Sequence, residues 1–338
     1  MLAAGFTLKR LWVDKDKKSR QLWLDLLALG HLGQNEQVDY TLAIFHGDNP
    51  VATGSLDGNI LKCLVVCKDY QAENLLTELV IALTERLAEQ DISHCFLYTA
   101  LDKEKIFHSL GFRLIAKNED ILFMERGKPD FSDYLKFLKS QEIVADGKKV
   151  GAIVMNANPF TKGHRYLVEQ AKKACDIVYV FVLSEERSKF SAVDRMNMVK
   201  LGTKDLENVV VLPTLNYMVS QATFPSYFLK ERSPEKKAWH QARLDATLFK
   251  EKIAPVLNIS TRFVGEEPFS PVTNLYNETM EKVFSPELAL KIIPRLAISG
   301  NIISATKVRK AIEEADSKVL EQFLPETSYT YLKEHNLL

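Results

Sequence analysis

Apolar residues in the first part of the chain follow the periods of strands and helices in turn. Short apolar runs bounded by turn-forming residues predict strands over 40–45, 60–66, 95–99, 112–115 and 121–125. Recurrence of apolar residues every three or four positions predicts helices over 71–89 and 103–110. This mixture indicates a mixed α/β domain at the start of the chain.

A break and a linker follow this first domain. The turn-forming run GKPD interrupts the pattern, and Phe131, Leu135 and Leu138 then fall on one face of a helix. The polar run ADGKK ends that helix. The expected organisation is a first domain over 1–126, a linker helix within 127–147 and a second domain over 148–338.

Strands and helices alternate in the second part of the chain. Strands are predicted over 150–155, 177–183, 209–212, 262–264 and 291–297. Helices are predicted over 162–175, 192–206 and 235–253, and from about residue 304. This alternation is typical of a Rossmann-like parallel sheet with helices on both faces. Ligands of such sheets bind beyond the carboxyl ends of the strands, where loops lead into helices.

Composition limits the classes of function. The 338 residues carry 44 Lys and Arg and 44 Asp and Glu, so the net charge is zero and no overall field attracts nucleic acid or an anionic membrane. The apolar runs are far shorter than the ~18 residues of a membrane span, and the first residues lack a signal-peptide pattern. The four cysteines form no CxxC pair, which favours buried thiols over a metal site and indicates a reducing, cytoplasmic location.

The first candidate site opens the first helix of the second domain. Thr161 stands at the N-cap position, and Lys162, His164 and Arg165 place positive charge in the first turn. The helix dipole already makes this end positive, so a bound phosphate would resolve the conflict. Gly163 would let such a ligand approach the backbone. The alternative is a plain N-cap with a solvated basic face.

The second candidate site opens the helix that starts near residue 304. Ser304 and Thr306 supply hydroxyl groups there, and Arg309 supplies a guanidinium suited to phosphate. Lys307 stands where a capping box would have Glu or Gln. Taken alone, this pattern is an ordinary helix cap. The two motifs together, each at a strand-to-helix turn of one α/β domain, favour phosphate binding.

Both motifs resemble signatures of the nucleotidylyltransferase superfamily. The segment TKGH (161–164) matches (H/T)xGH in its threonine form, and ISATKVR (303–309) matches ISxTxxR completely. Longer segments resemble the citrate (pro-3S)-lyase ligase family. They are VMNANPFTKGHRYLVEQA, SEERSKFSAVDR (184–195), TFPSYFLKE (223–231), RFVGEEP (262–268) and VTNLYNETM (272–280).

The resemblance extends over the whole chain, because that family carries an acyltransferase-like (GNAT) domain in front. The segment FHSLGFRLI (107–115) is similar to the GNAT segment that ends FxxxGF. GNAT enzymes hold the acetyl-CoA pyrophosphate on a loop of the form QxxGxG/A, whereas this chain has QAENLL (71–76). Side chains fill both glycine positions, and Glu73 would repel phosphate. This departure speaks against independent acetyl-CoA-dependent transfer and leaves a scaffold or carrier-docking role open.

The resemblance implies a reaction of ATP, with Mg²⁺, acetate and the acyl carrier subunit of citrate lyase. The thiol of that subunit's prosthetic group, which is similar to dephospho-coenzyme A, would receive the acetyl group through acetyl-adenylate. AMP and pyrophosphate would be released. No carboxylate cluster in the sequence indicates a protein ligand for Mg²⁺.

The resemblance also implies roles for individual residues. His164 and Thr161, assisted by Lys162, would stabilise the α- and β-phosphates during transfer. Candidates for holding ATP or pyrophosphate are Asn158, Phe160, Gly163, Arg195, Ser304, Thr306 and Arg309. Further candidates are Lys189 and Arg187 near the triphosphate, and Gly265 and Glu266 in the adenosine pocket.

Two other functions stay open at this point. One is an adenylyltransferase that acts on a phosphorylated acceptor such as a pantetheine phosphate and keeps AMP on the product. The other is a GNAT-type acyltransferase, or a binding module, whose second domain only senses ATP. The altered QAENLL loop speaks against the transferase, and two intact phosphate motifs speak against mere sensing. Nucleic-acid binding would require a basic face that the sequence lacks.

Overall fold

The computed structural model describes residues 2–186, 188–218, 224, 227, 229, 233–266, 271–298 and 300–338, without the side chains of 234 and 271–273. Two compact units make up the chain. The first consists of Met1–Asp133 and Phe224–His240, and the second of Tyr134–Thr223 and Gln241–Leu338. Arg187 and parts of the segments 223–231 and 262–268 lie outside the described residues.

A seven-stranded sheet of order β1-β2-β3-β4-β5-β7-β6 forms the centre of the first unit. The strands are β1 (Phe6–Leu11), β2 (Tyr40–His46), β3 (Asn49–Asp57), β4 (Ile60–Val66), β5 (His94–Ala100), β6 (Arg113–Lys117) and β7 (Ile121–Gly127). Only β4 and β5 pair in parallel, over two residues each, and the other neighbours are antiparallel.

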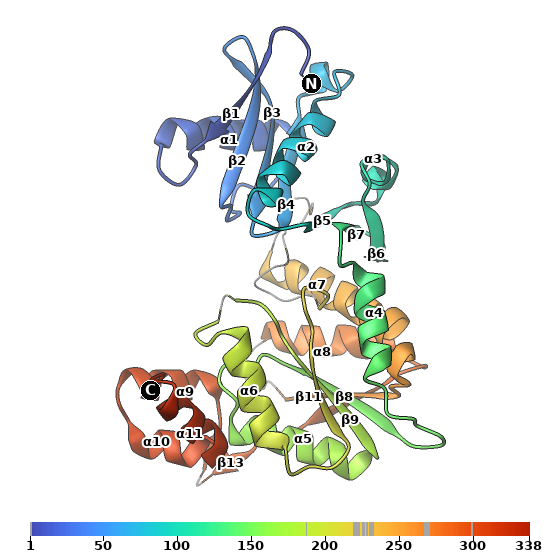
Figure 1. The fold of residues 1–338 in the computed structure, drawn as a ribbon, viewed down its shortest axis with the longest axis vertical. Coiled ribbons are helices and arrows are strands. Elements are labelled where there is room, and N and C mark those ends of the chain that lie inside the picture. The colour runs from blue at the N-terminus through green and yellow to red at the C-terminus, as the bar shows by residue number, and fades with distance from the viewer. Residues whose placement is uncertain are drawn as a thin grey trace. The chain divides into compact units, whose positions relative to one another are not determined.

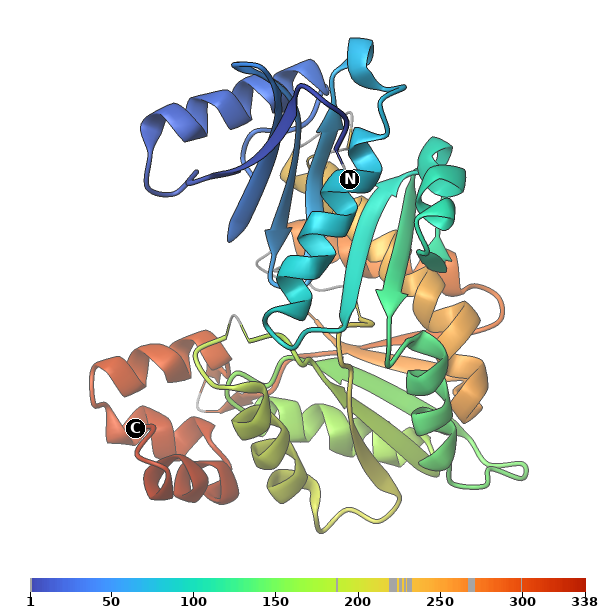
Figure 2. The ribbon, with the colours of Figure 1, turned by 45° about the horizontal axis from the view of Figure 1, so that its top comes forward.

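Helices cover both faces of this sheet. Side chains alternate along β2: Leu42 and Ile44 pack with α2 (Leu75–Ala88), whereas Ala43 and Phe45 pack with α1 (Lys17–Leu29). Successive residues of a strand point to opposite faces, so one strand serves two cores. Figures 1 and 2 show α1 and α2 on opposite sides of the strands. A short helix, α3 (Glu104–Ser109), precedes β6.

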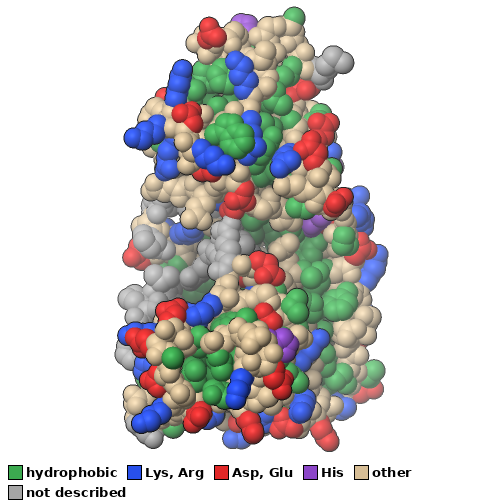
Figure 3. Space-filling model, turned by 60° about the vertical axis from the view of Figure 1, so that its left-hand side comes forward, with side chains coloured by type: hydrophobic (Ala, Val, Ile, Leu, Met, Phe, Trp, Pro, Cys, Tyr) green, Lys and Arg blue, Asp and Glu red, His purple; other side chains and the backbone are tan. Residues whose placement is uncertain are grey.

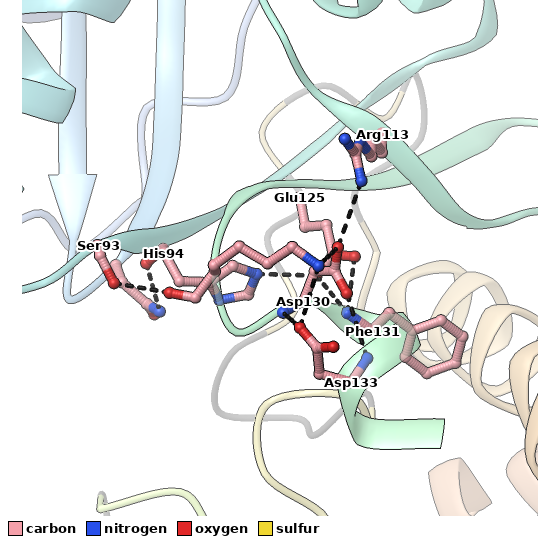
Figure 4. A network of polar contacts seen from close by, with 9 residues as sticks. Ser93, His94, Arg113, Glu125, Asp130, Phe131 and Asp133 are labelled. Carbon is pink, nitrogen blue, oxygen red and sulfur yellow. Dashed lines mark hydrogen bonds and ion pairs between the residues drawn. The ribbon is translucent and has the colours of Figure 1, made fainter. Parts of the chain in front are cut away.

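Carboxylates fix the end of β7 to the start of α4 (Phe131–Ser140), the helix that stands in the predicted linker. Figure 4 shows Glu125 beside the first turn of α4, where it accepts the backbone N–H of Phe131 at 2.9 Å. The same carboxylate lies 2.8 Å from Nε2 of His94. Asp130 and Asp133 accept each other's backbone N–H. Negative groups at this end of a helix interact favourably with its dipole.

The second unit contains a five-stranded sheet of order β10-β9-β8-β11-β12, and every pair is parallel. Its strands are β8 (Val150–Met155), β9 (Ile177–Val182), β10 (Val209–Pro213), β11 (Thr261–Gly265) and β12 (Ala289–Ile293). In chain order this is 3-2-1-4-5, so the order reverses between β8 and β11. Ligand crevices of Rossmann-like sheets lie at this position. The predicted mixed α/β fold with a parallel sheet in its second part is confirmed.

Helices also flank this sheet. Val178, Val180 and Val182 of β9 face a core shared with α5 (Lys162–Ala174) and α6 (Ala192–Thr203). The intervening Phe181 contacts Phe249, which follows α7 (Pro234–Leu248). The remaining helices are α8 (Pro271–Phe284), α9 (Ala305–Glu313), α10 (Ser317–Phe323) and α11 (Glu326–Glu334). Figure 1 shows the last three clustered beside α6.

Several predicted boundaries were wrong. The helix expected over 71–89 begins at Leu75, because Asn74 adopts a left-handed conformation with φ of 56°. The strand expected over 291–297 ends at Ile293, before Pro294, and a two-residue strand, β13 (Ala297–Ile298), then pairs with β14 (Asn301–Ile302). The helix expected over 235–253 is α-helical only to Leu248 and closes with a π-helical turn.

The described surface agrees with the balanced composition. On the face drawn in Figure 3, Lys and Arg side chains are interspersed with Asp and Glu side chains. Among the described residues, no helix is long and apolar enough to cross a membrane.

Candidate active site

The site begins with a reciprocal cap at the start of α5. The Oγ1 atom of Thr161 accepts the backbone N–H of His164 at 3.4 Å, and Nδ1 of His164 accepts the backbone N–H of Thr161 at 3.0 Å. This is the geometry of a capping box, with histidine in the position that Glu or Gln usually occupies. The ring also stacks on Phe160, with 5.8 Å between the ring centroids. His164 is therefore held from two sides.

This cap decides what His164 can donate. Because Nδ1 accepts a hydrogen bond, the neutral ring carries its proton on Nε2. Burial of the ring, together with the nearby positive charge of Arg295, lowers the pKa of His164 to about 4. At neutral pH the side chain is thus an uncharged donor with a fixed tautomer.

Two helix starts bring backbone donors to the same place. At the start of α5, the backbone N–H groups of Lys162 and Gly163 have no hydrogen-bond acceptor among the described residues. The same holds for the backbone N–H of Ala305 at the start of α9. A Cβ atom on Gly163 would lie 3.5 Å from Ile303, directly before α9. The first turns of these helices are therefore neighbours, and both direct positive dipole ends to one region.

The second motif caps α9 and reaches back to the first. Ser304 Oγ accepts the backbone N–H of Thr306 at 3.2 Å. Arg309 donates to Thr306 Oγ1 at 3.0 Å and to the carbonyl oxygen of Asn158 at 2.7 Å. The guanidinium thus links the turn before α5 to the first turns of α9. The structure brings the two predicted motifs together.

A cavity of about 550 Å³ lies between the motifs. Its described lining includes Thr161, Gly163, His164, Ser304, Thr306, Gly265 and Glu266, all predicted candidates. Val154 and Met155 from the end of β8 line it as well, as does Gly265 from the end of β11. The cavity thus stands at the point where strand order reverses, and its volume is typical of small-molecule sites.

Two of the positively charged side chains in the first turn of α5 bond to other parts of the protein. Lys162 donates to the carbonyl oxygens of Glu321 and Gln322, both at 2.9 Å. Arg165 forms a two-point ion pair with Asp205, which raises the pKa of the guanidinium and lowers that of Asp205 to about 2. Lys162 and Arg165, two of the crowded charges, therefore both bond to protein groups distant in the chain.

Arg195 is completely buried and bonded to backbone. Its guanidinium donates to the carbonyl oxygens of Leu183, at 2.7 Å, and of Phe190, at 3.1 Å, and also to Glu185. It donates to the carbonyl oxygen of Asn156 at 3.1 Å too. This geometry favours a role in shaping the loops after β8 and β9. Lys189, on that loop, pairs with Glu313 at 3.2 Å.

Asn158 and Phe160 form the inner support of the site. Asn158 Oδ1 accepts the backbone N–H of Phe190 at 3.2 Å. Phe160 is fully buried and packs against Gly202. A Cβ atom added to Gly202 would lie only 2.4 Å from the Phe160 ring. Neither side chain is among the lining residues of the cavity, so their contact with a ligand stays a prediction.

Arg295 was not among the predicted site residues. This residue follows β12, lines the cavity and donates from Nε to the carbonyl oxygen of Glu266 at 2.8 Å. The available signal was its position in a loop at the carboxyl end of a parallel strand. These features define the class of protein: a Rossmann-like α/β domain whose cavity offers hydrogen-bond donors to an anion, joined to a mixed α/β unit.

Comparisons with known proteins identify the family. The citrate lyase ligase C-terminal domain matches residues 150–332. The citrate (pro-3S)-lyase ligase of Haemophilus influenzae is 33% identical over 330 residues, which cover 95% of this chain and 97% of that protein. The Escherichia coli ligase is 34% identical over 332 residues, covering 96% and 92%. This chain belongs to the citrate lyase ligase family, as the sequence resemblance indicated.

A solved acetyltransferase structure also matches part of the chain. It comes from Streptococcus agalactiae, shares 12% sequence identity, and covers 37% of this chain and 99% of its own, with a TM-score of 0.31.

Proposed function

We propose that this protein activates citrate lyase by acetylating the thiol of the prosthetic group on its acyl carrier subunit at the expense of ATP. The names of relatives that match over nearly the whole chain support citrate lyase as the target enzyme. In the first step a carboxylate oxygen of acetate bonds to the α-phosphorus of ATP, the bond to the β-phosphate oxygen breaks, and pyrophosphate leaves. In the second step the carrier's thiolate attacks the acetyl carbon, the bond to the phosphate oxygen breaks, and AMP leaves.

The convergence of two helix N-termini with the Nε2–H group of His164 on one cavity carries this proposal. Transfer at phosphorus asks a protein mainly to position groups and to stabilise developing negative charge. His164 would donate to the α-phosphate, and Thr161 would hold the imidazole in its tautomer. Ser304, Thr306 and the N–H groups of α9 would receive the departing pyrophosphate, and Arg309 would add charge beside Thr306.

The residues present fit ATP and supply little for Mg²⁺. Glu266 is the single carboxylate among the described residues that line the cavity. Mg²⁺ commonly uses one or two carboxylates together with substrate phosphates and water. The ion would accordingly be held chiefly by the triphosphate, with Glu266 as the candidate protein ligand. The apolar residues Ile293, Pro294 and Leu296, next to Gly265, would accommodate the adenosine.

Every described residue that lines the cavity belongs to the second unit. We assign the first unit a part in presenting the carrier. Support comes from the turn before α2, where a GNAT-type pyrophosphate loop would require glycines. This chain has Asn74 and Leu76 at the two glycine positions, with Glu73 before them, and Oδ1 of Asn74 accepts a hydrogen bond from Thr77 at 2.5 Å.

The test measures the two half-reactions separately. Purified protein is given ATP, Mg²⁺ and acetate, and acetyl-adenylate is trapped with hydroxylamine as the hydroxamate. Acetylation of the carrier thiol is then followed with the carrier present. Formation of hydroxamate and pyrophosphate, followed by thiol acetylation with release of AMP, supports the proposal. A product that retains AMP on a phosphorylated acceptor would contradict it and favour an adenylyltransferase.

A further inference from the structure

Arg295 is the one residue with a formal positive charge among the described residues that line the cavity, because His164 is neutral there. It follows β12, and its Nε bond to the carbonyl oxygen of Glu266 ties it to the segment after β11. The guanidinium is thus anchored at the carboxyl ends of two parallel strands. An arginine in this position is well placed to meet a ligand.

The charge of Arg295 acts on His164. Repulsion from this guanidinium is the second cause, after burial, of the lowered pKa of the imidazole. Both side chains line the same cavity. An oxyanion held between the two side chains would meet a neutral Nε2–H donor on one side and a cation on the other. Its negative charge would relieve the repulsion between them.

We propose that Arg295 binds the oxyanion at the reacting end of the substrates, facing His164. The inference rests on the proposed function. In that function, the helix starts with Ser304 and Thr306 receive the pyrophosphate. Two oxyanions then remain at the reacting centre: the α-phosphate of ATP and the carboxylate of the acid. A guanidinium offers paired donors that suit either group.

A purely structural arginine would act through its protein contacts, such as the bond to the Glu266 carbonyl oxygen. Two variants separate these roles. Arg295→Gln removes the charge and retains an N–H donor, whereas Arg295→Lys retains the charge and loses the planar pair of donors. Lys291→Gln is the matched control, because Lys291 lies on β12, is exposed, and is not a lining residue of the cavity. It changes the net charge by the same amount, four residues before Arg295 in the sequence.

Three measurements are made on the full chain: NMR titration of the His164 ring, equilibrium binding of ATP without acid, and the KM for acetate in hydroxylamine trapping. We expect Arg295→Gln to raise the pKa of His164 from about 4, though not to the ordinary value, because burial remains. We also expect kcat/KM to fall about 10- to 100-fold, as loss of a charge-assisted contact does. Arg295→Lys should lie between, and Lys291→Gln should change nothing.

The substrate whose binding is weakened identifies the oxyanion that Arg295 contacts. Weaker ATP binding assigns Arg295 to the α-phosphate, and a higher acetate KM with unchanged ATP binding assigns it to the carboxylate. Unchanged His164 titration together with unchanged kinetics in both variants overturns the inference, as do equal effects from Lys291→Gln. If Arg295→Gln does not fold, Arg295→Lys decides by the same readouts. Failure of the wild-type protein to form an adenylate refutes the proposed function, whereas ATP binding and the His164 titration still judge Arg295.

Discussion

Replacing His164 tests two hydrogen bonds: the cap bond that the structure shows and the bond that we propose it donates to the ligand. In His164→Ala, the backbone N–H of Thr161 loses its acceptor, and Thr161 is only 2% exposed. A buried, unsatisfied donor costs about 1–3 kcal/mol, so the free energy of unfolding should fall by that amount. In His164→Gln, the side chain that capping boxes commonly use at this position restores the acceptor. Its stability should stay within about 1 kcal/mol of the wild type.

Catalysis should respond differently. Both variants lose the Nε2–H donor, and removal of one donor to a developing oxyanion slows reactions by about 10²–10³-fold. Hydroxamate formation should therefore fall by that factor in both variants, while urea unfolding distinguishes them. A glutamine variant that keeps the wild-type rate would reduce His164 to a helix cap. An alanine variant of unchanged stability would refute the structural half of the reasoning.

The same residue predicts a pH dependence of stability. Its pKa is near 6.5 in the unfolded chain and about 4 in the folded protein. Between these values the unfolded chain binds more protons, so the unfolding free energy should fall as the pH drops from about 6.5 to about 4. His164→Gln should lose this part of the dependence. An identical pH profile for the variant would show that the folded imidazole titrates normally.

Three further substitutions test the surroundings of the site. Arg309→Lys should slow pyrophosphate formation and weaken pyrophosphate as a product inhibitor, because one ammonium cannot replace a guanidinium that bonds both Asn158 and Thr306; an unchanged inhibition constant would contradict this. Gly202→Ala gains about 1 kcal/mol of helix propensity, but its Cβ would lie 2.4 Å from Phe160, and overpacking costs about 1–3 kcal/mol. Urea unfolding should show a net loss that Phe160→Leu relieves, and a more stable alanine variant would refute the packing. Arg195→Lys should lower the unfolding free energy by about 2–4 kcal/mol, since several buried carbonyls lose their donors; a loss below 1 kcal/mol would contradict the loop-shaping role.

Local patterns were sufficient for the elements that build the cavity. The strands β8 and β9 are short and apolar and lead to the helices α5 and α6, and both motifs cap helices. Elements with weaker patterns were not predicted. The edge strand β1 exposes Lys9 and Arg10 and has only one buried residue, Leu11, so its sequence lacks the period of a half-buried strand. No helix was predicted for α1 or α8.

Side-chain directions could not be predicted, because they depend on partners far away in the sequence. Lys162 meets carbonyl groups about 160 residues further along the chain, and Arg165 meets Asp205. Arg295 is surrounded by apolar neighbours in the sequence and becomes notable only when β11 and β12 bring it to the cavity. A residue-by-residue pattern records which charges are present, whereas tertiary contacts decide which of them remain available to a ligand.

The resulting cavity would bind anions by a different means than the sequence indicated. With Lys162 and Arg165 occupied by protein groups, the formal charges among its described lining residues are those of Arg295 and Glu266, and these cancel. Attraction for phosphate then comes chiefly from oriented N–H dipoles at two helix starts and from a neutral imidazole. Such dipoles act at short range and need no reorganisation when charge develops at phosphorus. In the proposed reaction, this arrangement would stabilise the transferring and departing phosphates without a strong long-range field, which favours release of pyrophosphate after the first step and of AMP after the second.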